Sequence, residues 1–230
     1  MRLIQKIKIA CLAILFATTT CISQTKNDDE KSLLRLKEYI IENQVDSALL
    51  MVGEISNINA FVDCNGFKYT SLGLACKYNR NEIVNQILNK DLVNINLGYT
   101  DDIFEFNTLD LVIENGNNEL FKLLLKRGVD YKEIFNENGN NALSSAVKHM
   151  QYEMVELLLL KGLPVNGVGD LGSDYSTIPL LIAVENQDVK MVELLIEKGA
   201  DANLKNPQGY SSVSVARSLD LSSILEILTK

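Results

Sequence analysis

Ile178-Pro-Leu-Leu-Ile-Ala183 is a short apolar run that recurs along this chain with a nearly fixed period. Each copy is followed by a polar break and a second apolar run, which for this copy is Met191-Val-Glu-Leu-Leu-Ile-Glu-Lys-Gly-Ala-Asp-Ala-Asn203. The central residues of the five copies, Leu72, Leu109, Leu143, Leu180 and Val213, lie 37, 34, 37 and 33 residues apart. Such a period predicts a solenoid of helix pairs, because no pair can bury its apolar face alone.

The local pattern within each copy is helical. Between residues 141 and 160, apolar side chains recur at the three-and-four spacing of an amphipathic helix. Glycines follow the second run at Gly128, Gly162 and Gly199, where a helix commonly ends in a left-handed residue. We expect the second-helix leucines Leu124, Leu158 and Leu195 to be buried.

These copies resemble the ankyrin repeat, whose consensus contains Thr-Pro-Leu-His-x-Ala and Leu-Leu-Leu-x-x-Gly-Ala-Asp-Val-Asn. The resemblance implies an all-α ankyrin-repeat solenoid of stacked antiparallel helix pairs with β-hairpin-like fingers between repeats. It covers residues 32–230 as about six units, with the first and last as caps. The consensus His is replaced at every copy, by residues such as Gly73 and Asp110. We therefore expect apolar stacking to carry more of the contact between repeats.

The first 23 residues have the pattern of a secretory signal peptide. A basic segment, residues 1–8, precedes the apolar Ile9-Ala-Cys-Leu-Ala-Ile-Leu-Phe-Ala17, which is too short to span a membrane. We place cleavage after Ser23, followed by a short disordered lead-in over residues 24–31. A lipoprotein alternative would make Cys21 the acylated residue, although Thr20 stands where a small residue is usual. The expected location is periplasmic or secreted, without membrane insertion after cleavage.

Charge and cysteine content limit the partners. Removing residues 1–23 removes Arg2, Lys6 and Lys8 and no acid, so the formal charge of −8 becomes −8 − 3 = −11. This charge disfavours nucleic acid and favours a basic protein surface. Cys64 and Cys76 would remain, and we expect both to be free, with Cys76 buried as a small hydrophobe.

Residue patterns for catalysis, metals and cofactors are missing from the sequence. His149 is the single histidine, and no Gly-x-Ser-x-Gly motif occurs. The segment 170–174 superficially resembles a calcium loop but has Gly172 at a ligand position and no closing Glu. We therefore expect no enzyme, no metal and no cofactor.

The fingers and the concave face formed by the first helices, where exposed positions such as Asn115 would lie, are the candidate binding surface implied by the resemblance. Three of the fingers, residues 59–70, 96–107 and 166–178, are longer than usual and carry aromatic residues, which interface hot spots favour. The segment 99–106 stands out because it combines three aromatic with three acidic residues. Some of these rings would alternatively fold back onto the helices. The candidate partner-binding residues are Tyr99, Phe104, Phe106, Phe67, Tyr69, Tyr78, His149 and Tyr175.

The sequence thus predicts an exported, monomeric protein–protein interaction module that acts by recognition. An inhibitor or immunity-type protein is one version of this function. The alternative is a structural scaffold or envelope-stress accessory protein without a dedicated partner, and an enzyme with an unrecognised site is a third, weaker hypothesis. The aromatic fingers favour the first.

Overall fold

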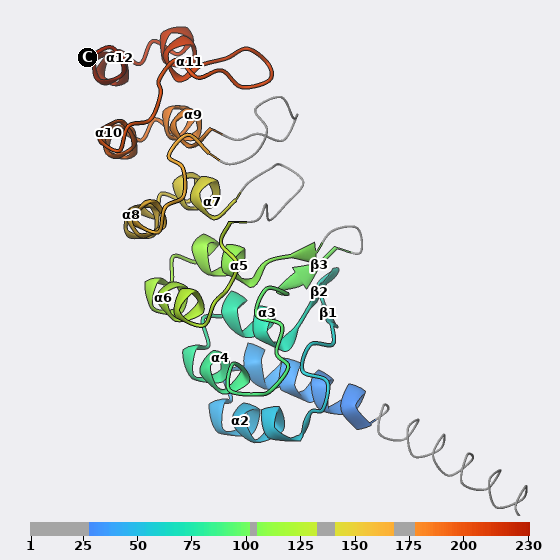
Figure 1. Cartoon of the computed structure of the whole chain (residues 1–230). Coiled ribbons are helices and arrows are strands. Elements are labelled where there is room, and N and C mark those ends of the chain that lie inside the picture. The colour runs from blue at the N-terminus through green and yellow to red at the C-terminus, as the bar shows by residue number, and fades with distance from the viewer. Residues whose placement is uncertain (1–27, 102–104, 133–140, 168–177) are drawn as a thin grey trace, which may run out of the picture.

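The computed structural model describes residues 28–101, 105–132, 141–167 and 178–230. Within them the chain forms six consecutive helix pairs that stack into an elongated solenoid (Figure 1). Residues 28–41 are helical and pair with α2 (Val45–Glu54). The five further pairs are α3 (Ser71–Lys77) and α4 (Asn81–Ile87), α5 (Thr108–Glu114) and α6 (Asn118–Lys126), α7 (Ala142–Lys148) and α8 (Tyr152–Leu160), α9 (Pro179–Glu185) and α10 (Val189–Glu197), α11 (Ser212–Ser218) and α12 (Ser222–Leu228). The predicted antiparallel helix pairs are confirmed.

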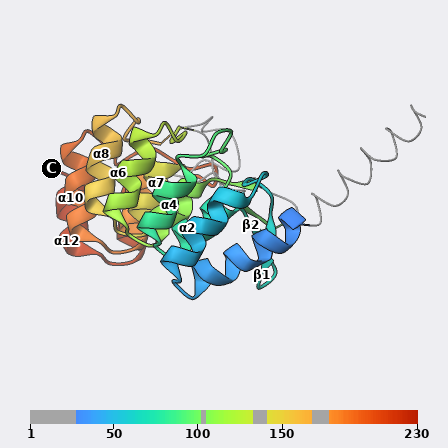
Figure 2. The same ribbon diagram turned by 90° about the horizontal axis from the view of Figure 1, so that it is seen from below.

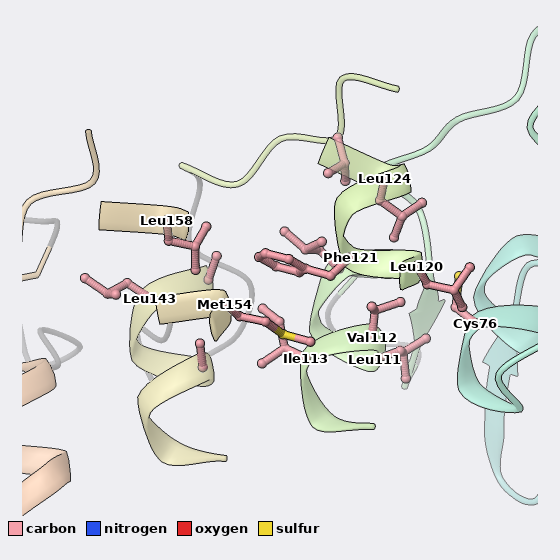
Figure 3. Packing of buried hydrophobic residues seen from close by; sticks show 14 of the residues in the cluster. Cys76, Leu111, Val112, Ile113, Leu120, Phe121, Leu124, Leu143, Met154 and Leu158 are labelled. Atoms are coloured by element: carbon pink, nitrogen blue, oxygen red, sulfur yellow. The ribbon is translucent and has the colours of Figure 1, made fainter. Parts of the chain in front are cut away.

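Two parallel columns of helices enclose one continuous core. The first helices α3, α5, α7, α9 and α11 pack on one another in sequence order, and second helices pack in the same way, as α2 does on α4. Leu124, Leu158 and Leu195 are completely buried, as predicted. Phe121 projects from α6 toward Met154 and Leu158 of the next pair (Figure 3). Each pair therefore supplies the surface that covers its neighbour.

A left-handed residue makes the turn between the two helices of each pair. Asparagine or glycine, which tolerate this conformation, occupies it at Asn43, Asn79 and Gly116. A second left-handed residue follows the second helix, with φ near 87–89° at Gly128, Gly162 and Gly199, as expected. In the second pair the equivalent residue is Leu92, with φ of 61° and 93% of its side chain exposed.

Polar side chains link neighbouring repeats in addition to the apolar stacking that was expected in place of the missing histidines. Asn115 Nδ2 donates to Lys77 O at 2.8 Å, and Arg80 Nε donates to Ile40 O at 2.9 Å. A further set joins successive fingers, in which an asparagine Oδ1 accepts from a backbone N–H of the next repeat at 2.8 Å: Asn59 from Asn94, Asn96 from Asp130, and Asn166 from Asp201. These bonds satisfy backbone groups that the stack would otherwise leave unpaired.

The first two fingers form one antiparallel sheet with the order β1-β2-β3-β4. Its strands are β1 (Val62–Cys64), β2 (Phe67–Tyr69), β3 (Tyr99–Thr100) and β4 (Glu105–Phe106). The finger prediction is thus confirmed here, and the purely helical class needs this small sheet added. Pairing of β2 with β3 joins two repeats. In the last finger the corresponding feature is an isolated bridge between Lys205 and Ser211.

A close backbone contact allows the two fingers to meet. Thr70 N donates to Gly98 O at 3.0 Å, and a Cβ placed on Gly73 would lie 2.0 Å from the same oxygen. Gly73 stands where the ankyrin consensus has histidine. The absence of a side chain there therefore lets the base of the second finger press against α3.

The N-terminal end differs from the sequence prediction. The proposed disordered lead-in over residues 24–31 extends too far, because residues 28–31 are helical and Asp29 hydrogen-bonds to Ser56. These helical residues and α2 close one end of the stack (Figure 2), and Lys37 Nζ donates to Asp63 O of β1 at 3.2 Å. The proposed signal peptide, residues 1–23, lies outside the described residues. Among the described residues, no helix has the length and apolar character to cross a membrane.

Truncation of Leu158 tests the stacked core. Leu158→Ala removes a completely buried side chain and should lower the free energy of unfolding by about 2–5 kcal/mol. Urea denaturation followed by circular dichroism measures the change. Leu160→Ala is the matched control, because Leu160 is 84% exposed two residues away in α8. Equal effects of the two substitutions would contradict the assigned packing.

Candidate partner-binding site

An aromatic row crosses the sheet formed by the first two fingers. Tyr69 of β2 lies directly opposite Tyr99 of β3, which lies opposite Phe106 of β4. The rings of Tyr69 and Tyr99 stack with centroids 5.3 Å apart, and those of Tyr99 and Phe106 stack at 4.4 Å. Cross-strand aromatic pairs stabilise a sheet beyond the area they bury. The row therefore holds the two fingers in one rigid unit.

The rings of this sheet differ in solvent exposure. The difference distinguishes rings that support the sheet from rings that a partner could contact. Tyr69 is 3% exposed, so it supports the aromatic row and exposes little of its own ring to a partner. Tyr99 and Phe106 are half-buried. Phe67 is 42% exposed and meets Tyr99 edge to face at 6.1 Å. The sequence left two roles open for these rings, partner binding and covering of the helices. The buried Tyr69 fits the second role, and Phe67, the most exposed ring, fits the first.

A pocket of about 410 Å³ lies between the aromatic sheet and the first helices α3 and α5. The structure brings together four of the predicted binding residues in its wall, Phe67, Tyr69, Tyr78 and Tyr99, with Phe106 stacked on Tyr99. The pocket also contains Asn115, which was expected on the concave side, and three lining residues that the sequence-based choice missed: Lys77, Leu111 and Glu114. Lys77 and Glu114 could have been found, because they occupy the same position in successive repeats.

A single ammonium group sits inside this pocket. Lys77 Nζ donates to the Tyr69 hydroxyl at 2.5 Å and lies 4.4 Å from the centroid of the same ring. Partial burial is the largest single effect and works against the charged form, but the hydrogen bond to Tyr69 and the electrostatic interactions with Tyr69, Cys64 and Tyr78 together outweigh it, so the pKa of Lys77 is raised. Lys77 therefore stays protonated and contributes a positive charge to an otherwise aromatic wall.

The hydroxyl of Tyr99 stays neutral. Burial, together with the nearby carboxylates of Asp110 and Glu114, raises the pKa of Tyr99 well above its usual range. The Tyr99 side chain consequently offers an uncharged ring with a hydrogen-bonding tip, which suits recognition of another protein surface.

Asp110 extends the site along the first helices. It is half-buried, and Ser145 Oγ of the next repeat donates to its Oδ1 at 2.6 Å. Burial raises the pKa of Asp110, while this hydrogen bond and the charges of His149 and Lys148 oppose the increase. His149 is half-buried at the C-terminal end of α7, one repeat beyond the pocket. It does not line the pocket.

Two predicted binding residues, Phe104 and Tyr175, lie outside the described residues. Within the described parts, no group of three or more His, Cys, Asp or Glu side chains could hold a metal ion. Cys64 and Cys76 are both free, as expected, and Cys64 is also buried. Burial raises the pKa of the Cys76 thiol far above its usual value, so it packs as an unreactive side chain.

Comparison with known proteins agrees with this architecture. A family model described as ankyrin repeats (3 copies) matches residues 72–168 and 109–206. This chain belongs to the ankyrin repeat family. Its repeats are 28% identical over 139 residues to an ankyrin repeat protein of fowlpox virus, a match that covers 60% of this chain and 29% of the viral protein.

Two solved structures share the fold. The ankyrin repeat domain of Bcl-3, a member of the IkappaB family, superimposes with a TM-score of 0.68 at 26% identity, covering 85% of this chain and 81% of that domain. A chain from the complex of the predatory endopeptidase Bd0816 of Bdellovibrio bacteriovorus with the immunity protein Bd3460 gives a TM-score of 0.69 at 23% identity, covering 84% and 96%. Ankyrin repeats mediate protein–protein interaction, which fits the character of the pocket.

Substitution of Asp110 tests the electrostatics of the site. Since burial raises its pKa above 3.8, the ionised carboxylate disfavours the folded state. This cost is absent below about pH 3.8 and is complete once the pH exceeds the pKa in the folded protein. Asp110→Asn should therefore raise the melting temperature at about pH 7 and change it little at about pH 3.

The matched control for this experiment is Glu193→Gln, which removes one exposed carboxylate from the middle of α10. It corrects for the change in net charge. If Asp110→Asn destabilises the protein equally at both pH values, the bond to Ser145 outweighs the burial of the charge and the assigned cause is wrong.

Proposed function

We propose that this protein is an exported interaction module that binds a partner protein in the pocket between the aromatic sheet and the first helices. The observation that carries the proposal is the exposed Phe67 ring, which meets Tyr99 edge to face and is one of four aromatic side chains that line the pocket. Large exposed rings on a rigid support are what high-affinity interfaces use as anchors. The rigidity limits the entropy lost on binding.

The preferred partner is a basic protein with an apolar anchor residue. The predicted mature chain carries a net charge of −11, from −8 − 3, which would steer a cationic surface toward it. Glu114 at the pocket rim and the half-buried Asp110 add negative charge close to the rings. The apolar anchor would fill the aromatic pocket, while the basic surroundings of that anchor would meet the acidic surface.

We infer further that the protein acts as an inhibitor or immunity-type protein, which masks its partner by occupation of a surface. Support comes from the rigid pocket and from the occurrence of this fold in a complex of an endopeptidase with an immunity protein. That likeness, at 23% identity, concerns the fold, and the assignment of inhibition to this chain is our proposal. Recognition of this kind requires no chemistry by the ankyrin repeats.

Export is tested by the N-terminus of the protein made in its native cells. Because residues 1–8 are basic and residues 9–17 are apolar, we expect a processed chain that begins at or near Gln24. Intact-mass spectrometry of the protein purified from the cell envelope or the medium measures this. A chain that begins with a lipid-modified Cys21 would indicate membrane anchoring, and an unprocessed chain in the cytoplasm would overturn export.

Substitution of Phe67 tests the binding pocket. Phe67→Ala removes the most exposed ring of the pocket and should reduce partner capture from an envelope extract at least about tenfold, with little change in melting temperature. Tyr99 is a poorer probe, because it stacks on Tyr69 and Phe106 and its loss would weaken the sheet.

Tyr210→Ala is the matched control, since Tyr210 is 57% exposed in the last finger, far along the chain from the pocket. We expect it to capture the same partner as the unsubstituted protein does. Capture that is unaffected by Phe67→Ala, or capture of no defined protein at all, would contradict the proposal and favour a scaffold without a dedicated partner.

A further inference from the structure

A row of alternating charges runs along the first helices of four successive repeats. The last residue of α3 is Lys77, that of α5 is Glu114, that of α7 is Lys148 and that of α9 is Glu185. Each residue follows the central leucine of its repeat by the same distance in sequence, so the four positions are equivalent. We refer to these four residues as the charge row.

The charges of this row form no ion pairs within the described part of the fold, and Lys77 donates a hydrogen bond to the Tyr69 hydroxyl. Among the residues that the structure describes, Lys122 and Glu153 form an ion pair. None of the four members of the charge row forms one with another described residue. Glu114, Lys148 and Glu185 are exposed, and Lys77 is half-buried. The three exposed side chains are therefore available to charges outside the protein, and Lys77 presents its charge in the wall of the pocket.

Helix stability does not account for the sign of these charges. A negative charge at the C-terminal end of a helix is unfavourable because it adds to the partial negative charge of the unpaired carbonyl groups. Glu114 and Glu185 are both in this unfavourable position, and neither of their helices has a basic residue in its last turn. Helix stability therefore leaves the sign of these two charges unexplained.

The row begins inside the aromatic pocket. Lys77 and Glu114 both line it, so this end of the row faces the rings. Further along, Ser145 Oγ of the next repeat donates to Asp110 Oδ1 at 2.6 Å, and Lys148 and Glu185 end α7 and α9 as Glu114 ends α5. The aromatic pocket and the charge row therefore belong to one continuous surface.

We propose that this surface binds an α-helix of the partner protein, laid along α3, α5, α7 and α9, with an acidic, a basic, an acidic and a basic residue about seven positions apart. The proposal rests on the proposed function, because it names the partner element that fills the same site. Neighbouring first helices pack directly on each other, which sets their axes about 8–10 Å apart. Seven residues of α-helix rise about 10.5 Å and return to nearly the same face, so each charge would meet one member of the row.

An extended strand fits this spacing less well. A strand rises about 3.3 Å per residue, so three residues cover the distance between repeats. Because successive side chains of a strand point to opposite faces, every second charge at this spacing would point away from the row. The helical repeat is the arrangement that keeps all four charges on one side.

Two designed peptides test the proposal with the mature protein. Both are alanine-rich helices of about 28 residues, long enough to be helical and to span four repeats. The alternating peptide carries Glu, Lys, Glu and Lys at seven-residue spacing. The block peptide carries Glu, Glu, Lys and Lys at the same four places, so composition and net charge are equal. Whichever way the block peptide lies along the charge row, it places an opposite charge against two of the four residues of the row.

We expect the alternating peptide to bind about tenfold more tightly than the block peptide in fluorescence anisotropy at low salt, because two charge pairs change from repulsive to attractive. The difference should disappear at about 1 M salt. A proline in the middle of the alternating peptide should abolish its advantage. Equal affinity of the two peptides, or full retention of the advantage with proline, overturns the proposal.

A double exchange in the protein provides the matched test. Glu114→Lys combined with Lys148→Glu keeps the net charge and changes two exposed side chains. The row then reads Lys, Lys, Glu, Glu, so the block peptide should become the tighter ligand and the alternating peptide the weaker one. Circular dichroism confirms that the fold is retained. An unchanged order of affinities contradicts the assigned row.

The outcomes of these tests are separable. If Phe67→Ala abolishes partner capture but the two peptides bind equally, the binding pocket stands and the helical partner is wrong. If the peptides follow the row and reverse with the double exchange but Phe67→Ala leaves capture unchanged, the charge row recognises a helix and the aromatic pocket is not the anchor of the proposed function.

Discussion

The mutual covering of successive helix pairs is the constraint on which the rest of this structure depends. Each pair has apolar side chains on two sides, and the next pair supplies the surface that removes them from water. Phe121, Leu124 and Leu158 are completely buried at such contacts. Because the same contact recurs, equivalent positions of successive repeats come into line, and a surface property can extend over several repeats.

Polar bonds add direction to this stacking. Burial of apolar area is nearly indifferent to small shifts of one pair over another, whereas a hydrogen bond fixes a distance and an angle. Asn115 on the Lys77 carbonyl and Asn96 on the Asp130 amide are bonds of this kind. Between the two fingers whose strands β2 and β3 pair, the bond of this kind runs from the Asn94 amide to Asn59 Oδ1.

The candidate site follows from that alignment. Gly73 admits the base of the second finger, the two fingers pair, and the rings of Tyr69, Tyr99 and Phe106 stack in one row. Phe67 then remains exposed on this paired sheet and lines the same pocket as Lys77. A surface prepared in this way can gain affinity from a few rings, while the excess of acidic over basic residues in the chain would direct the approach of the basic partner proposed above.

The sequence by itself determined the repeat architecture, because the period of the apolar runs and the glycines after the second helices depend on local geometry and on burial between neighbours. It also indicated the aromatic fingers. Only the tertiary structure decided that Tyr69 supports while Phe67 presents its ring, and that Lys77 and Glu114 share their pocket. The difference arises because strand pairing between two fingers joins residues some 30 positions apart, such as Tyr69 and Tyr99. Such pairing depends on how closely two backbones approach, here at Gly73 and Gly98, which no pattern of hydrophobic residues specifies.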